Sequence, residues 1–368
     1  MKMFEYMGKE LFMKFGIPVP KGKIAMTPED AGKITAEIGD SVIKSQILSG
    51  KRGKAGGIKF TADPNEAIEF SAGLLGKELS GYTIEAILVE EKLKIDKEYY
   101  LAITVDRAMK CPVVLASTYG GMDIEEVPEE YMVKYYIEYA VGMMPFCARE
   151  ITRRLDIPPT EAKQVQDILQ KLYKMFVTLD AELVEINPLV VCGDRVIAAD
   201  AKVTIDDDAL FRHQDLPYVD ERSESEKKAY ELGLAYVELD GNIGVLANGA
   251  GITMATLDTI QYYGGTAANF LDAGGGAGEE ATAKALELIM EKHPKAILIN
   301  IFGGITRCDD VANALASIKK KMDITVPLVI RLVGTNQEKG REILQEIGID
   351  TFDTMHEAAQ KAVELANN

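Results

Sequence analysis

The chain has 368 residues, of which 47% are hydrophobic and 27% charged, and its formal net charge is −17 at pH 7. This composition is typical of a globular protein of about two domains, and the negative charge disfavours broad binding to nucleic acid, which requires a basic surface. No apolar run reaches the ~18 residues that span a bilayer, the first residues lack the features of a secretory signal, and the four cysteines have neither metal-ligand nor disulfide spacing. We therefore expect a cytoplasmic protein with reduced thiols.

The first part of the chain combines helices with strands that suit antiparallel pairing. An amphipathic pattern predicts a helix over residues 4–15, and Thr27 before Pro28 predicts the start of a second helix. Another helix is expected over about residues 160–180. Strands are expected at residues 41–47, 57–61, 83–90, 99–106, 112–117, 182–191 and 195–203.

The pattern changes after a charged helical segment at residues 220–234. From Asn242 onward, helices alternate with short apolar strands, whose sequences are IGVLAN, TAANFLDA, AILINIF, PLVIRLV and IDTF. Apolar strands separated by helices predict a parallel sheet covered on both faces, in a doubly wound α/β domain that binds ligands at the carboxyl ends of its strands. We therefore expect one domain over residues 1–234 and a second over residues 235–368.

A glycine- and lysine-rich loop joins two of the predicted strands. Lys44 precedes this loop, which has the sequence SGKRGKAGG at residues 49–57. Glycine lets backbone N–H groups approach phosphate oxygens and lysine supplies positive charge, although the loop lacks the GxxxxGK[ST] pattern of a P-loop. The loop is either a flap over a nucleotide or a basic surface loop.

A hairpin is predicted around the two-residue loop that begins at Gly193, since glycine in the first position suits a type II′ turn. Reflection about this loop places Asn187 opposite Asp200, with both side chains on one face of the hairpin. An amide oxygen beside a carboxylate oxygen suits Mg²⁺, which completes its coordination with nucleotide phosphates and water. The alternative is a solvated polar face.

The same reflection places Glu185 opposite Lys202, on the face that carries the proposed metal ligands. This pair is either part of the site or an ordinary cross-strand ion pair. Pro188 removes a hydrogen-bond donor from the ladder, so we expect its strand to lie at an edge or to contain a bulge.

Several weaker candidates follow other predicted strands. Glu90 and Glu98 lie at strand ends, where they either accept hydrogen bonds from a ribose or are solvated charges. The glycine turns at 248–251 and 303–307 each precede a predicted helix, whose N-terminus can bind an anion. None of the three histidines, and no serine or cysteine, stands in a pattern typical of a covalent nucleophile.

Taken together, these segments resemble the succinyl-CoA synthetase β-subunit family, which comprises ADP-forming succinate–CoA ligases. The resemblance covers essentially the whole chain, and its most specific motifs are RGKAGG, LDGNIG, NGAG and NIFGGITRCD. Three positions depart from the family pattern: Lys51 replaces a glycine, Tyr119 a glutamate and Thr306 a valine.

The resemblance implies an N-terminal ATP-grasp domain followed by a flavodoxin-like CoA-ligase domain. Such a β subunit converts ATP, succinate and CoA reversibly to ADP, phosphate and succinyl-CoA, with Mg²⁺ as cofactor. Its partner is an α subunit that carries the phosphorylated histidine and most of the CoA site. Pro20 matches the relatives that use ATP rather than GTP. The alternatives are the β subunit of a related ligase, such as malate–CoA ligase, a standalone ATP-grasp carboxylate–amine ligase, and a non-catalytic nucleotide sensor.

The resemblance also implies roles for individual residues. The implied nucleotide contacts are Lys44, Lys51, Arg52, Gly53, Glu90, Leu93 and Glu98. The implied Mg²⁺ ligands are Asn187 and Asp200, and Glu185 resembles the carboxylate that meets the phosphohistidine. The implied substrate contacts near the subunit interface are Asn248, Gly304, Ile305 and Thr306.

Overall fold

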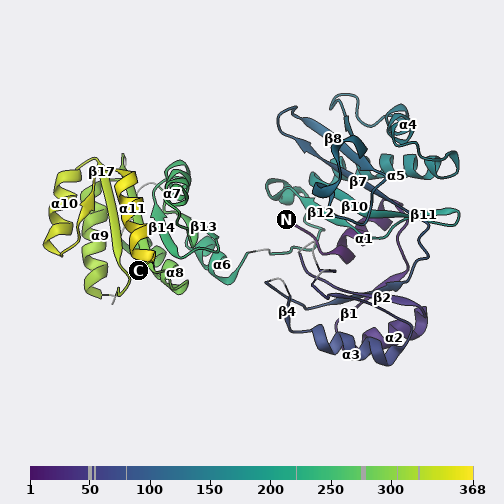
Figure 1. Ribbon diagram of the computed structural model, residues 1–368, viewed down its shortest axis with the longest axis horizontal. Helices are drawn as coiled ribbons and strands as arrows, with labels where there is room; N and C mark the ends of the chain where they lie inside the picture. The colour runs from purple at the N-terminus through teal and green to yellow at the C-terminus, as the bar shows by residue number, and fades with distance from the viewer. Residues whose placement is uncertain are drawn as a thin grey trace. The chain divides into compact units, whose positions relative to one another are not determined.

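The computed structural model of the chain forms two compact units, Met1–Glu221 and Arg222–Asn368 (Figure 1). The structure describes residues 1–48, 52–53, 55–79, 81–220, 222–274, 279–304, 306–321 and 324–367. Within these ranges, no helix combines the length and the apolar character that crossing a bilayer requires.

The division between the units lies earlier in the chain than the expected boundary at 234/235. Helix α6 (Glu224–Glu231) belongs to the second unit, because Ala229 is buried in the same core as Leu234. Lys228 of α6 also forms an ion pair with Glu291 of that unit at 2.9 Å. Because most residues of α6 are charged or polar, its sequence does not indicate that it packs against the second unit.

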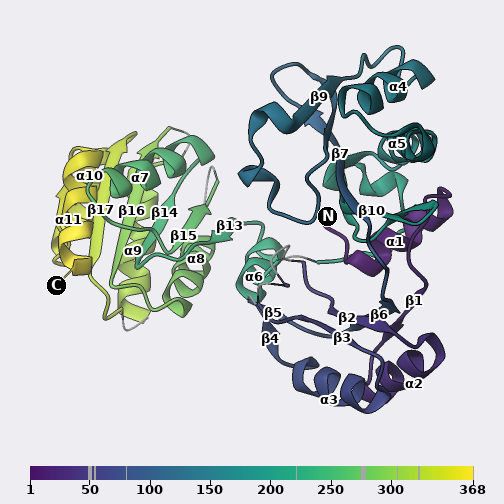
Figure 2. The ribbon, with the colours of Figure 1, turned by 45° about the vertical axis from the view of Figure 1, so that its right-hand side comes forward.

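The first unit contains a four-stranded antiparallel sheet in the order β1–β6–β2–β3. Its strands are β1 (Gly22–Ala25), β6 (Ile87–Glu91), β2 (Ser41–Ser45) and β3 (Ile58–Thr61). Helices α2 (Pro28–Ile38) and α3 (Pro64–Leu74) cover the sheet, and apolar side chains of both share its core (Figure 2). Thr27 caps α2 as predicted, because its Oγ1 accepts the N–H of Asp30 at 3.2 Å.

A second, six-stranded antiparallel sheet follows the order β11–β10–β7–β8–β9, with β12 also paired to β10. Its strands are β7 (Lys97–Asp106), β8 (Cys111–Ser117), β9 (Met132–Tyr136), β10 (Ala181–Cys192), β11 (Arg195–Ala198) and β12 (Lys202–Ile205). The helices packed on its core are α1 (Glu5–Lys14), α4 (Pro145–Arg154) and α5 (Pro159–Thr178). In Figures 1 and 2, α1 lies between the two sheets of the unit.

Short elements complete the first unit. They are strands β4 (Glu78–Leu79) and β5 (Tyr82–Thr83) and the 3₁₀ helices η1 (Ile124–Glu126), η2 (Glu129–Tyr131) and η3 (Asp207–Arg212). The predicted strand at 83–90 is therefore divided between β5 and β6, and the predicted strand at 195–203 between β11 and β12.

The second unit is built on a six-stranded sheet in the order β13–β15–β14–β16–β17–β18. Its strands are β13 (Ala235–Glu238), β14 (Ile243–Ala247), β15 (Asn269–Asp272), β16 (Ala296–Gly303), β17 (Leu328–Gly334) and β18 (Thr351–Phe352). All pairs are parallel except β13 with β15. The five predicted parallel strands are confirmed, whereas the antiparallel edge strand β13 was not predicted.

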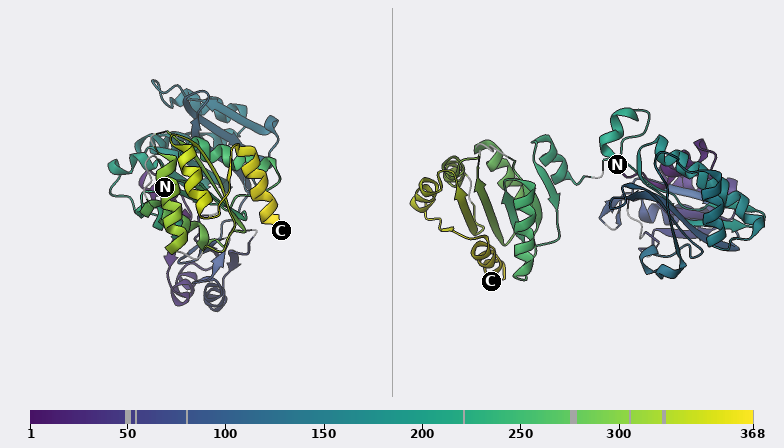
Figure 3. Two further views of the ribbon diagram at one scale, coloured as in Figure 1. Left: turned by 90° about the vertical axis from the view of Figure 1, so that its left-hand side faces the viewer. Right: turned by 90° about the horizontal axis from the view of Figure 1, so that it is seen from above.

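Helices cover both faces of this sheet, which confirms the doubly wound α/β prediction (Figure 3). One face carries α6 and the helices α8 (Glu279–Glu291), α9 (Cys308–Lys321) and α10 (Gln337–Glu346). The other face carries α7 (Ala250–Tyr262) and α11 (Met355–Asn367). The five parallel strands follow the flavodoxin-like order 2-1-3-4-5, so the topological switch point lies between β14 and β16.

Candidate functional site

The hairpin of the six-stranded sheet has the predicted register. The chain turns at Gly193, whose φ of 62° suits the first position of a type II′ turn. Cys192 pairs with Arg195 next to the turn, and Glu185 pairs with Lys202 further along, where the strand resumes as β12. The predicted juxtaposition of Glu185 and Lys202 is therefore confirmed.

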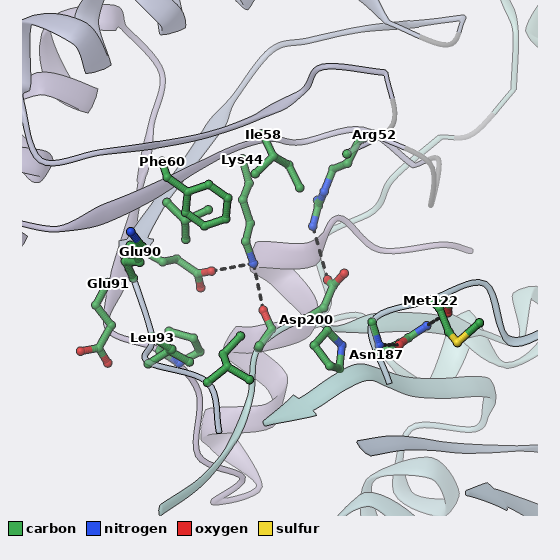
Figure 4. A pocket seen from close by; sticks show the side chains of 18 of the residues that line it. Lys44, Arg52, Ile58, Phe60, Glu90, Glu91, Leu93, Met122, Asn187 and Asp200 are labelled. Carbon is green, nitrogen blue, oxygen red and sulfur yellow. Dashed lines mark hydrogen bonds and ion pairs between the residues drawn. The ribbon is translucent and has the colours of Figure 1, made fainter. Parts of the chain in front are cut away.

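Between β11 and β12 the hairpin opens without losing its register. The N–H of Ala199 still donates to the carbonyl of Pro188 at 3.1 Å, which keeps Asn187 opposite Asp200. On its other side, β10 shifts register against β7 beside Pro188, as expected of a strand that contains proline. Figure 4 shows Asn187 and Asp200 as neighbours at the cavity wall.

A cavity of about 360 Å³ separates the two sheets of the first unit. In Figure 4, Phe60 and Leu93 lie at one end, Asn187 and Asp200 at the other, and Lys44 between them. The residues that line the cavity are Pro20, Val42, Lys44, Arg52, Gly53, Ile58, Phe60, Glu90, Glu91, Lys92, Leu93, Ile95, Gly121, Met122, Asp123, Asn187, Pro188, Ala199 and Asp200. The end at Phe60 and Leu93 is lined mainly by apolar side chains and is called the apolar end, although Glu91 and Lys92 also line the cavity there. The end at Asn187 and Asp200 is called the charged end.

A second cavity, of about 570 Å³, adjoins the charged end of the first. All four residues predicted to share one face of the hairpin line it, namely Glu185, Asn187, Asp200 and Lys202. Four residues line both cavities and form the wall that they share: Arg52, Asp123, Asn187 and Asp200.

Charged side chains converge beneath this shared wall on the carboxylate of Glu5, which is 4% exposed. The ammonium groups of Lys9 and Lys44 each lie 2.8 Å from Glu5 Oε1, and the guanidinium of Arg52 donates to Oε2. Burial alone would raise the pKa of Glu5, but the three cations outweigh burial and hold this pKa well below its usual range. Glu5 is therefore ionised in spite of its burial.

Two further carboxylates balance the same cations. Glu90 is 1% exposed and accepts hydrogen bonds from Lys9 at 2.6 Å, while Lys44 lies 3.0 Å from its Oε2. Asp200 Oδ1 lies 3.4 Å from the guanidinium of Arg52. The Asp200 side chain is 38% exposed, but it lies within the protein wall, where reduced solvation raises the pKa of its carboxyl group. The charge of Glu5 raises this pKa further. The cluster thus contains three acidic and three basic side chains.

Asn187 and Asp200 have oxygens that suit a hard cation. Asn187 Oδ1 accepts the N–H of Gly121 at 2.8 Å, and Nδ2 donates to the carbonyl of Met122 at 3.0 Å. These two hydrogen bonds fix the orientation of the amide and show which of its atoms is the oxygen. That oxygen retains a second lone pair. Within the described residues, every hydrogen bond of the Asp200 carboxylate ends on Oδ1, which leaves Oδ2 available as a metal ligand. One amide and one carboxylate oxygen fit Mg²⁺.

The other predicted nucleotide contacts are distributed unevenly. Arg52, Gly53, Glu90 and Leu93 line the first cavity, but Glu90 is occupied by its two lysine partners. Glu98 lies beside the cavity rather than on its wall, with its carboxylate against Gly121. Burial raises the pKa of Glu98. The predicted contact Lys51 lies outside the described residues.

In the second unit, two predicted substrate contacts meet at the switch point of the sheet. Asn248 follows β14, and its side-chain amide exchanges two hydrogen bonds with the backbone of Phe302 in β16, at 2.8 and 2.9 Å. This amide extends the pairing of the two strands beyond Ala247. Gly304 follows directly after β16, and its carbonyl accepts a hydrogen bond from Thr335 at 3.1 Å. Ligands of doubly wound domains bind at this location.

The other predicted substrate contacts, Ile305 and Thr306, do not add exposed groups to this edge of the sheet among the described residues. Thr306 is 5% exposed, and Ile305 lies outside the described residues. The turn that precedes α7 has an internal partner, because the N–H of Gly249 donates to Asp272 at 2.5 Å.

Sequence reasoning missed Glu5 and Lys9, although both form ion pairs with residues that line the charged end of the first cavity. The two residues share the buried stripe of α1 with Gly8 and Phe12, at the i, i+3, i+4 and i+7 spacing of one helix face. A glutamate and a lysine within an apolar stripe were the available signal, because charged residues are almost never buried without partners.

Comparisons with known proteins agree with both units. A family model described as an ATP-grasp domain matches residues 2–191, and one described as CoA-ligase matches residues 246–365. The ATP citrate lyase of Methanothrix soehngenii, solved with citrate and coenzyme A, superposes with a TM-score of 0.70 over 99% of both chains. At 20% identity, that similarity concerns the fold alone.

Similar curated proteins match over the full length. The chain is 44% identical to the succinate–CoA ligase [ADP-forming] subunit beta of Staphylothermus marinus, over 100% of this chain and 99% of the relative. The corresponding protein of Methanothermobacter thermautotrophicus is 45% identical over 100% of both chains. Subunit beta 2 of Archaeoglobus fulgidus is 46% identical over 100% of this chain and 99% of the relative. The chain therefore belongs to the family of ADP-forming succinate–CoA ligase β subunits, with an ATP-grasp domain followed by a CoA-ligase domain.

Proposed function

We propose that this chain is the nucleotide-binding β subunit of a succinate–CoA ligase and works with an α subunit. The complex would convert ATP, succinate and CoA reversibly to ADP, phosphate and succinyl-CoA. The observation that carries this proposal is the first cavity, where an apolar end faces a charged end with two cations and an amide–carboxylate pair. An adenine nucleotide has the same division between an apolar base and a charged phosphate tail.

In this proposal the base lies at the apolar end of the first cavity, near Phe60 and Leu93. The phosphates lie toward Lys44 and Arg52, whose charges offset the negative charge on a phosphoryl group in transfer. The backbone of Leu93 contacts the base, and Glu90 holds Lys44 in place through the 3.0 Å ion pair.

We assign Asn187 Oδ1 and Asp200 Oδ2 as the protein ligands of Mg²⁺. When bound, the ion would offset phosphate charge and act as a Lewis acid on the transferred phosphoryl group. Asn187 is kept in place for this role by its two hydrogen bonds to the loop at Gly121 and Met122. Ala201 orients the Asp200 carboxylate through its N–H, at 2.7 Å.

The second cavity would receive the histidine of the α subunit that accepts the phosphoryl group. Glu185 lines this cavity and would orient the imidazole for attack. Burial limits the solvation of the Glu185 carboxylate and so raises its pKa, which makes this carboxylate a stronger acceptor for a hydrogen bond from the ring. Arg52 lies in the wall shared by both cavities, so its guanidinium can contact the phosphoryl group both on the donor and on the acceptor.

The second unit would take part in thioester formation. Asn248 and Gly304 lie at the carboxyl ends of β14 and β16, where the switch point offers backbone groups to an anionic ligand. Substrate and phosphate are the expected ligands there. Asn248→Ala should therefore impair thioester formation more than histidine phosphorylation.

The direct test is reconstitution with the α subunit. The complex should release one ADP for each histidine that it phosphorylates, and should continue to form ADP from MgATP only when succinate and CoA are both present. The chain alone should not complete the reaction. Equal or faster turnover with malate or acetate would reassign the acid, and ATP turnover by the chain alone with an amine would overturn the proposal in favour of a carboxylate–amine ligase.

The metal ligands can be tested by nucleotide binding alone. We expect Mg²⁺ to tighten the binding of ADP to the wild-type chain and to have little effect on Asp200→Asn, because the amide removes the charged ligand. Asp194→Asn is the matched control, since Asp194 lies at the exposed tip of the same hairpin. Equal Mg²⁺ dependence in Asp200→Asn and Asp194→Asn would contradict the assignment.

A further inference from the structure

The carboxylate of Glu5 lies at the centre of the charge cluster and has four side-chain donors around it. Lys9 and Lys44 approach Oε1 at 2.8 Å, and Arg52 and Gln46 approach Oε2, the latter at 3.5 Å. Glu5 therefore receives contacts from both cations that face the phosphate end of the first cavity.

Glu5 reaches these cations from outside the first cavity. Among the described residues, Lys44 and Arg52 line that cavity whereas Glu5 lines only the second. Glu5 therefore has no direct access to a nucleotide in the first cavity, and its effect on such a ligand passes through the two cations.

The position of Glu5 is fixed by the packing of α1. Gly8, one turn further along the helix, lies so close to the chain at Ala201 that an added Cβ would come within 3.1 Å of the Ala201 side chain. This close approach places the N-terminal turn of α1 beside the segment that carries Asp200. The backbone N–H of Tyr6 also donates to the side chain of Gln46, at 3.1 Å, which ties α1 to the end of β2.

We propose that Glu5 is a positioning residue for the nucleotide site, where it fixes the Lys44 ammonium and the Arg52 guanidinium in the orientation that binds phosphate groups. This inference rests on the proposed function, since it takes the first cavity as the nucleotide site. Glu5 supplies an anchor that is present before the nucleotide arrives, so the two long side chains lose their rotamer freedom on folding rather than on binding.

A simpler role for Glu5 would be charge balance within the cluster. Its replacement by glutamine would leave two acidic and three basic side chains in the interior. Replacement of Lys9 by methionine in the same molecule restores equal numbers, because Lys9 is the cation of the cluster that lines neither cavity. The Glu5→Gln/Lys9→Met variant thus restores neutrality without restoring the anchor of Lys44 and Arg52.

The experiment measures the dissociation constants of adenosine and of ADP for the full chain, in the absence of Mg²⁺. Adenosine reports the apolar end of the first cavity, and the ratio of the two constants reports the phosphate end. We expect Glu5→Gln to weaken ADP about tenfold, the order of effect of losing the preorganisation of long side chains at a binding site. Adenosine should bind as in the wild type, and the double variant should bind ADP as weakly as Glu5→Gln.

Glu10→Gln is the matched control, because Glu10 lies exposed on the same helix; it should bind both ligands like the wild type. Recovery of ADP binding in the double variant would overturn the inference and leave charge balance as the role of Glu5. Equal weakening of adenosine and ADP, or unchanged ADP binding in Glu5→Gln, would overturn it as well. If Glu5→Gln does not fold, the double variant alone decides. A wild-type chain that binds neither ligand would reject the nucleotide site itself, and the inference with it.

Discussion

At the scale of single residues, the interior of the first unit depends on charges that compensate one another. Glu5 and Glu90 are almost completely buried, and both are paired with Lys9 and Lys44 at 2.6 to 3.0 Å. Removing one member of such a group leaves an uncompensated buried charge, which costs more than the pair contributes to stability. The cluster is therefore sensitive to any change in ionisation.

This sensitivity predicts a specific response to acid. The folded-state pKa of Glu5 is lowered, so Glu5 contributes stability above the ordinary carboxyl pKa of 4.5, and this contribution is lost as the pH falls toward the lowered value. We expect the unfolding free energy of the wild type to fall more steeply than that of Glu5→Gln as the pH is lowered below about 5. Urea unfolding at a series of pH values measures both slopes. A slope in Glu5→Gln equal to that in Glu10→Gln would contradict the prediction.

The sequence identified one half of the site and not the other for a physical reason. A two-residue turn fixes the register of its hairpin, so the positions of Asn187 and Asp200 follow from counting. Nothing in the local sequence shows which partners a helix will meet. A glutamate and a lysine four residues apart, such as Glu5 and Lys9, usually lie on a solvated helix face. Their place in an apolar stripe indicates burial, but only the contacts with β2 and β6 show which residues they pair with.

At the scale of elements, helices α2 and α3 pack closely because glycine leaves space between them. A Cβ on Gly32 of α2 would lie 2.6 Å from the side chain of Ile68 in α3 and 3.1 Å from the carbonyl of Pro64. A Cβ on Gly73, near the end of α3, would meet no atom within 4 Å. A methyl group added at Gly32 would therefore collide with α3, whereas one added at Gly73 would not.

We expect Gly32→Ala to destabilise the chain, because α2 and α3 must separate or Ile68 must change its rotamer. Gly73→Ala should stabilise it by about 0.5–1 kcal/mol, the usual gain of alanine over glycine inside a helix. Chemical denaturation of both variants measures the difference. Stabilisation by both substitutions would show that helix propensity, rather than the packing of α2 on α3, controls the response.

The elements that the sequence failed to predict have identifiable causes. The predicted strand at 195–203 is divided opposite Pro188, because proline has no N–H to donate to the carbonyl of Ala199. This carbonyl accepts hydrogen bonds from the ammonium groups of Lys9 and Lys44 instead, both at 2.9 Å. That acceptor serves the charge cluster instead of the ladder. Strand β13 has four residues, of which Ala235 and Val237 are exposed, and it is antiparallel to its neighbour β15. It therefore lacks the buried apolar run that identified the parallel strands.

At the scale of the whole molecule, the two units have separate hydrophobic cores. Among the described residues, the two buried clusters of the first unit end at Val219 and the two clusters of the second begin at Ala229. The parallel arrangement of the five strands could be expected from their alternation with helices. The boundary could not, because α6 is recognised as part of the second unit only by its packing on β13 and α8.

Separate cores predict two calorimetric transitions with different responses to nucleotide. ADP with Mg²⁺ should raise the midpoint of the transition that belongs to residues 1–221 and leave the other unchanged, since a ligand stabilises only the unit to which it binds. At a free concentration about 100 times the dissociation constant, the stabilisation is about 2.7 kcal/mol. Equal shifts of both transitions, or a single transition, would show that the units unfold together.

The wall between the two cavities has a consequence for the genetics of this enzyme. Under the function proposed above, the first cavity holds the phosphoryl donor and the second receives the acceptor. A substitution at Arg52, Asn187 or Asp200, which line both cavities, would then change the binding of donor and acceptor together. Phe60 lines only the first cavity and Lys202 only the second. Under the proposed function, substitutions at Phe60 and at Lys202 would therefore affect the two half-reactions separately, whereas substitutions in the shared wall would affect both.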